Sequence, residues 1–110
     1  MTRLVVLAVF AMAAAGQSAV RIVFAGDVML DNGPGHVVAH GGDPFADVAA
    51  ALKDGDFTVA NLECAIVSAG EMAYKNYVFR GPKSALPLLH KYFSAVSLAN
   101  NHTLDYGRKG

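Results

Sequence analysis

Side chains that can bind a metal ion gather at the ends of three apolar runs of the sequence. The first run ends in Asp27, the second in Asn61 and Glu63, and the third in Asn100, Asn101 and His102. Two carboxylates, an amide oxygen and an imidazole form a mixed oxygen and nitrogen set that suits manganese, zinc or iron. The residue types therefore predict a site for a divalent metal, provided that the fold brings the three run ends together.

Each of these residues also has a simpler explanation. A single aspartate after a strand is most often a helix cap or a turn residue, and asparagines such as Asn100 and Asn101 tolerate a left-handed turn. The coincidence at three run ends favours a metal site over three separate turns. His36, His40 and His90 have no such neighbours, and we expect them to be loop or surface residues.

Strands must position this site, and the apolar runs predict three of them, at residues 22–24, 57–63 and 94–102. The first is a continuous apolar run, which is typical of a strand covered on both faces. A glycine-rich loop is expected at 31–42 and an extended excursion at 71–81.

Two helices are expected between the strands. One begins at its cap, Asp43, and ends at Gly55, and its apolar residues recur with helical spacing. The other is opened by Ser84, tolerates Pro87 in its first turn and ends at Phe93. The resulting order, β-α-β-α-β, favours an α/β fold with a parallel sheet. Ligands bind at the carboxyl ends of parallel strands, so the three run ends should meet along one edge.

The composition limits the classes of function. The chain has 110 residues, of which 54% are hydrophobic, and its nine basic residues balance its nine acidic residues. It lacks the basic surplus expected of a nucleic-acid-binding protein, so no nucleic-acid partner is expected. Cys64 is the single cysteine of the chain, which excludes an internal disulfide, and its apolar neighbours predict a buried structural thiol.

Residues 1–19 have the pattern of a secretory signal peptide. Arg3 provides the positive start, the apolar run spans 4–15, and small residues follow it as cleavage sites. A retained membrane anchor is the alternative, but it needs about 20 apolar residues. We therefore expect export to the periplasm, the cell surface or the medium, and a remaining domain of residues 20–110.

Three segments carry a resemblance to a known family: "FAGDVML", "DPFADVAAALKDGDFTVANLECAI" and "SLANNHTLDYGRKG". From Arg21 onward they resemble the amino-terminal part of the poly-gamma-glutamate capsule synthesis proteins, the CapA-type family. That family is similar in fold to the calcineurin-like metallophosphoesterases, which form an α/β/β/α sandwich. The resemblance implies that residues 20–110 are an incomplete domain of this kind, holding a partial parallel β-α-β-α-β sheet.

The resemblance also implies roles for individual residues. The implied metal ligands are Asp27, Glu63, Asn101 and His102. His102 is the expected general acid, because an ordinary pKa near ~6.5 suits proton transfer at neutral pH. Asp105 is expected to hold the His102 ring in one tautomer, with a turn cap before Gly107 as its alternative. A bound divalent ion would lower the pKa of a water molecule and contact a phosphoryl oxygen.

Three functions follow as hypotheses. The resemblance favours an exported protein that acts in the biosynthesis or export of poly-gamma-glutamate, an anionic polymer, beside membrane-associated polymer synthesis machinery. The alternatives are a metal-dependent phosphoesterase with another substrate and a non-catalytic polymer-binding module. A serine esterase is excluded at the Gly-Asp motif, because Val28 occupies the place of the nucleophile. We expect the chain to be a fragment that is inactive on its own.

Overall fold

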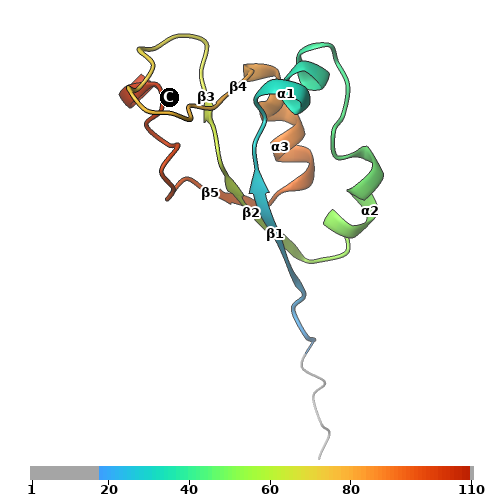
Figure 1. The fold of residues 1–110 in the computed structure, drawn as a ribbon. Helices are drawn as coiled ribbons and strands as arrows, with labels where there is room; N and C mark the ends of the chain where they lie inside the picture. Colours follow the sequence, from blue (N-terminus) through green and yellow to red (C-terminus); the bar gives the residue numbers. More distant parts are fainter. Residues whose placement is uncertain (1–17, 110) are drawn as a thin grey trace, which may run out of the picture.

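A three-stranded parallel sheet runs through the structure, a computed structural model that describes residues 18–109 (Figure 1). Its strands are β1 (Ile22–Val28), β2 (Phe57–Leu62) and β5 (Ala95–Ser97), in the order β1-β2-β5. The predicted α/β fold with a partial parallel sheet is confirmed. The leader predicted at 1–19 lies almost wholly outside the described residues.

Within residues 18–109, three α-helices lie together on one side of this sheet (Figure 1). They are α1 (Asn32–Ala39), α2 (Ala49–Leu52) and α3 (Leu86–Tyr92), and the single-turn 3-10 helices are η1 (Ala46–Val48), η2 (Lys83–Ala85) and η3 (Gly107–Lys109). The core fills the space between the helices and the sheet. Its larger members include Leu30, Leu52, Leu62, Leu89, Tyr92 and Phe93. Cys64 belongs to this core, so the predicted buried thiol is confirmed.

Helix α1 corrects the prediction of a loop at 31–42. The side chain of Asp31 caps the helix by accepting a hydrogen bond from the Asn32 N–H at 2.7 Å. Pro34 falls in the first turn, where a missing N–H costs nothing. Gly35 is buried, and a Cβ at this position would meet the Leu30 carbonyl oxygen at 2.5 Å. The glycine therefore allows close packing of a helix against the end of β1, whereas the sequence pattern suggested a turn.

The lone histidines are exposed, as predicted, although two of them are not loop residues. His36 lies in α1 and His90 lies in α3, while His40 follows the last residue of α1.

Asp43 connects the segment before α2 to helix α3. One carboxylate oxygen accepts a hydrogen bond from the Phe45 N–H at 3.0 Å. The other accepts from the Lys91 Nζ at 2.8 Å and from the Tyr92 hydroxyl at 2.7 Å. The predicted helix is present, but it begins as the 3-10 turn η1 and becomes α-helical only at Ala49. The second predicted helix likewise begins with η2, which contains Ser84, and Pro87 lies in the first turn of α3.

These contacts make the stability of the fold depend on pH. Hydrogen bonds from Lys91 and Tyr92 lower the pKa of Asp43, and the Asp43 carboxylate raises the pKa of Lys91 to about 12. A carboxylate with a lowered pKa stabilises the folded state above its unfolded pKa of 3.8, and this contribution is lost as the pH falls through the folded pKa. We expect Asp43→Asn to lose less stability than the unmodified chain between about pH 6 and pH 3. Urea unfolding at both pH values measures the difference, with the exposed Asp47→Asn as control.

A second, two-stranded parallel sheet lies beyond β2, and the sequence did not predict it. It pairs β3 (Ala65–Ile66) with β4 (Arg80–Gly81). The loop 67–79 connects the two strands without a helix, in agreement with the extended excursion predicted there. This loop arches toward the segment that follows β5 (Figure 1).

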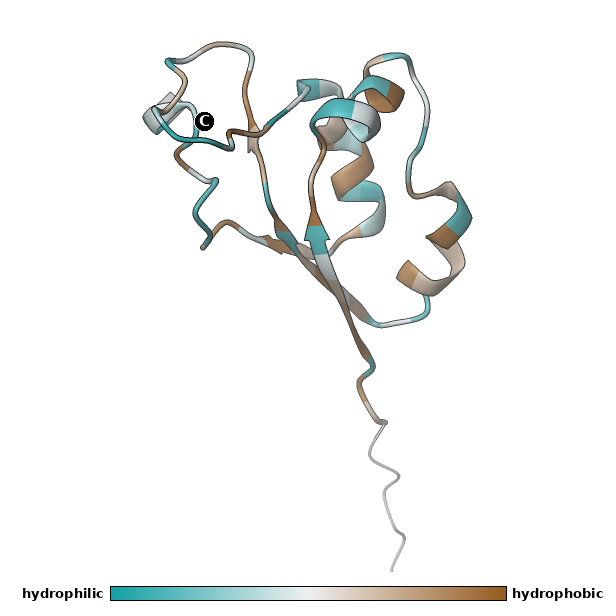
Figure 2. Ribbon diagram, in the orientation of Figure 1, coloured by the Kyte–Doolittle hydropathy of each residue, from teal (hydrophilic) through white to brown (hydrophobic). Residues whose placement is uncertain are grey.

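The side of the main sheet that faces away from the helices is apolar and exposed. Ile22 pairs with Phe57 and Phe24 pairs with Val59 along it. Phe24 is 78% exposed, and Figure 2 shows the hydrophobic colour running along these strands. The prediction that the first strand is covered on both faces is therefore wrong for the described chain. A continuous apolar run identifies a strand, but it does not show what covers the strand's second face.

Candidate metal centre

The carboxyl ends of β1 and β2 place Asp27 and Asn61 side by side. The register of the two strands shifts between Phe24 and Asp27, after which Asp27 pairs with Asn61. Asn61 in turn pairs with Ser97 of β5. Glu63 is the first residue after β2, and its N–H donates to the Val28 carbonyl at 2.9 Å. The irregularity in β1 thus brings the Asp27 carboxylate level with the last residues of β2.

Two asparagine amides join the three strand ends into one network. The Asn61 Nδ2 donates to the Asp27 Oδ1 at 2.9 Å and to the Glu63 Oε2 at 2.5 Å. The Asn100 Nδ2 donates to the Asn61 Oδ1 at 2.8 Å and to the Leu62 carbonyl at 2.9 Å. The Asn100 Oδ1 accepts from the His102 N–H at 2.9 Å. Groups that are far apart in the sequence therefore meet at one edge of the sheet.

His102 and Asp105 form a buried pair beside this network. Their side chains touch through the His102 Nδ1 and the Asp105 Oδ2, 2.7 Å apart, and Asp105 is fully buried. The Phe79 N–H donates to the same Oδ2 at 2.6 Å, and the Phe79 ring lies against the His102 ring with a centroid separation of 4.4 Å. Lys75 forms an ion pair with the Asp105 Oδ1. The predicted contact between Asp105 and His102 is present, and its part in catalysis stays a prediction.

The surroundings of Asp105 favour its charged form. Burial alone would raise the pKa of this carboxyl, but hydrogen bonds from Lys75, His102 and the Phe79 N–H outweigh it, so the pKa lies below the ordinary 3.8. A carboxylate can only accept, so the His102 Nδ1 carries the ring proton in this contact. In the neutral form of the ring, Nε2 is then the unprotonated nitrogen on its other side.

The Nε2 of His102 faces a second carboxylate. It lies 3.7 Å from the Glu63 Oε1, and both side chains are largely buried. A lone pair and a carboxylate oxygen that face each other in this way need a positive charge between them. A second ring proton or a cation would supply it. The donor set of Asp27, Glu63 and His102 therefore suits a divalent metal in its chemistry.

The comparison with protein families shows the family of the chain. A model of the bacterial capsule synthesis proteins, PGA_cap, matches residues 21–110. The chain belongs to this family. None of the curated proteins compared with this capsule synthesis protein matches it. Within residues 18–109, no helix is both long and apolar enough to cross a bilayer.

The four predicted ligands of this capsule synthesis protein do not all belong to the network at the strand ends. Asp27, Glu63 and His102 belong to the network, whereas Asn101 is exposed and its carbonyl oxygen accepts from the Lys75 Nζ at 2.6 Å. The neighbouring Asn100 has the side chain that enters the site. Among the described residues, no three His, Cys, Asp or Glu side chains are clustered tightly enough to form a complete metal site.

Sequence reasoning missed Lys75 and Phe79. Both lie in or at the end of the loop 67–79, and both contact Asp105 across 26 or more positions of the chain. A lysine and a phenylalanine in an irregular excursion have no periodic pattern that would single them out. The predicted ligand was Asn101 and not Asn100, and no pattern could decide between them, because adjacent residues at a strand end differ only in the turn that the backbone takes.

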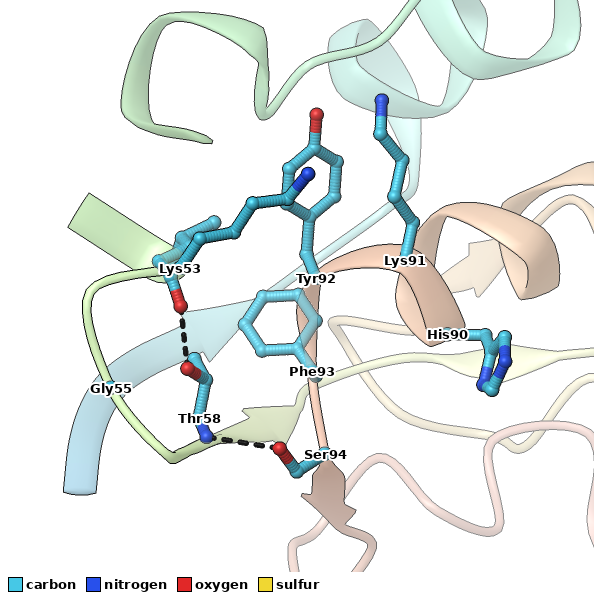
Figure 3. Close-up of a pocket in the computed structure, with 9 residues that line it drawn as sticks. Lys53, Gly55, Thr58, His90, Lys91, Tyr92, Phe93 and Ser94 are labelled. Carbon is cyan, nitrogen blue, oxygen red and sulfur yellow. Dashed lines mark hydrogen bonds between the residues drawn. The ribbon is translucent and has the colours of Figure 1, made fainter. Parts of the chain in front are cut away.

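The pocket in Figure 3 lies at the opposite, amino-terminal end of the strands. It has a volume of 330 Å³, and its lining includes Thr58 at the start of β2 and Ser94 before β5. Lys53 and Lys91 both lie over the Tyr92 ring there. None of the residues of the metal-centre network lines this pocket, so it is separate from the candidate site.

Proposed function

We propose that this protein acts outside the cytoplasm in the synthesis or export of the capsule polymer poly-gamma-glutamate, through a metallophosphatase-like site. Membership of the capsule synthesis family supports the process. The leader-like pattern at 1–19 supports a periplasmic, cell-surface or secreted location. The sequence resemblance supports the polymer, which is anionic, and membrane-associated synthesis machinery as a partner.

One observation supports a metal most directly, namely the Nε2 of His102 opposite the Glu63 carboxylate at 3.7 Å. Asp27, Glu63 and His102 would hold the ion, and an amide oxygen from Asn101 or its neighbour Asn100 would complete the set. Manganese, zinc and iron all accept such mixed oxygen and nitrogen ligands. A calcineurin-like α/β/β/α sandwich remains part of this proposal.

The contacts of its two ring nitrogens determine whether His102 acts as a metal ligand or as a general acid. Its Nδ1 contacts Asp105, so only Nε2 is available. Nε2 cannot bind a metal and carry an acidic proton at the same time. We infer the ligand role, because Glu63 stands opposite Nε2. When bound, the metal would supply Lewis-acid activation of water and stabilise negative charge on a phosphoryl oxygen. Asp105 orients the ring, and Asn61 holds the two carboxylates toward each other.

Mn²⁺ titration of the purified chain and of His102→Ala tests the metal site. We expect saturable binding that the substitution removes, because the ring nitrogen is one of few ligands. Absence of binding to the unmodified chain would refute the site. His90→Ala is the matched control, since this exposed histidine lies in α3 away from the network.

Two assays separate the alternative functions. Metal-dependent turnover of a generic phosphoester would favour a phosphoesterase with another substrate. Undiminished binding of poly-gamma-glutamate by a metal-free His102→Ala chain would favour a non-catalytic polymer-binding module.

A further inference from the structure

Several contacts hold the loop 67–79 against the segment 101–106. The Ala73 N–H donates to the Asp105 carbonyl at 2.8 Å. The Phe79 N–H donates to the Asp105 side chain at 2.6 Å. Gly70 passes so close to the Tyr106 carbonyl that an added Cβ would lie 2.6 Å from its oxygen. The loop is therefore held against the turn that carries His102.

Lys75 makes the contacts that bear most directly on the His102 ring. Its Nζ donates at 2.6 Å to the carbonyl of Asn101, which is the residue before His102. The same Nζ forms the ion pair with the Asp105 Oδ1, while the Asp105 Oδ2 holds the ring nitrogen. One ammonium group thus fixes the backbone on one side of His102 and the carboxylate on the other.

We propose that Lys75 is a positioning residue for His102. By occupying Oδ1, its ammonium group fixes the rotation of the buried carboxylate, so that Oδ2 remains directed at the ring nitrogen. The bond to Asn101 fixes the turn from which the ring projects. Groups that hold a ligand histidine in one tautomer contribute strongly to metal affinity. The proposal rests on the proposed function only in taking His102 as the functional group.

Ring-nitrogen NMR of His102 in the metal-free full chain at neutral pH tests this role. The unmodified chain and Lys83→Met, which changes an exposed lysine in η2, should show a single ring pattern with a proton on Nδ1. Lys75→Met should lose this single pattern and show a mixture of ring forms, whereas Lys75→Arg should keep it. A purely structural lysine would change the melting temperature and leave the ring pattern of the folded chain unchanged.

Several outcomes would overturn the proposal. A folded Lys75→Met chain with the unmodified ring pattern would do so, as would a folded Lys75→Arg chain that has lost it. If Lys75→Met does not fold, Lys75→Gln removes the charge while keeping a polar side chain, and the same comparison applies.

A metal titration extends the test. Where the unmodified chain binds Mn²⁺, Lys75→Met should bind about 10–100-fold more weakly, as is typical for partners of ligand residues. Equal affinity of the two chains would contradict the proposal. A chain that binds no Mn²⁺ would refute the metal site, and the ring pattern would still decide the role of Lys75.

Discussion

Glu63→Gln should weaken Mn²⁺ binding by about 100-fold or more, because loss of an outer partner already costs about 10–100-fold and Glu63 is a direct ligand in the proposal. The substitution keeps the shape of the side chain and removes its charge. The Asn61 Nδ2 can still donate to the remaining oxygen, so the network around the strand ends should persist. Calorimetric titration of both chains measures the ratio of affinities.

The control for this prediction lies in the nearby loop. Glu71 is exposed, and Glu71→Gln makes the same chemical change outside the network. We expect its Mn²⁺ affinity to equal that of the unmodified chain. If Glu63→Gln and Glu71→Gln have the same affinity, the ion is not held at the edge of the sheet.

The sequence contains enough information to predict the strands and the edge at which they end. Each strand is marked by a short apolar run, and parallel pairing follows from the helices between the runs. Once the strands are parallel, Asp27, Glu63 and His102 must lie at the same edge. These three residues are joined in the structure through Asn61, Asn100 and the contact of Glu63 with His102.

Other features depend on contacts that no local pattern records. Gly35 and Pro34 suggest a turn, yet they lie in α1 because the helix packs closely against Leu30. The exposure of Phe24 could not be predicted, because a strand's apolar run is the same whether or not a second layer covers it. Lys75 reaches Asp105 from a loop with no periodicity, so only the folded chain brings the two together.

Asp105→Ala should lower the free energy of unfolding by about 3 kcal/mol or more, since a hydrogen bond to a charged group contributes about 1.5–3 kcal/mol and two are lost. Asp105 is fully buried, and its carboxylate accepts from His102 and Phe79 and is ion-paired with Lys75. Without it, the Phe79 N–H and the His102 ring lose their acceptor inside the protein. The loop 67–79 would also lose its charged attachment to the turn that carries His102.

This loss of stability is large, because the total free energy of unfolding of a small domain is only about 5–15 kcal/mol. Urea unfolding should therefore show a large fall in the midpoint for Asp105→Ala. Asp105→Asn should fall less, since its amide oxygen still accepts one hydrogen bond. Asp47→Ala, which changes an exposed carboxylate in η1, should stay within about 0.5 kcal/mol of the unmodified chain. Equal midpoints for Asp105→Ala and Asp47→Ala would mean that the buried carboxylate does not hold the loop and the turn together.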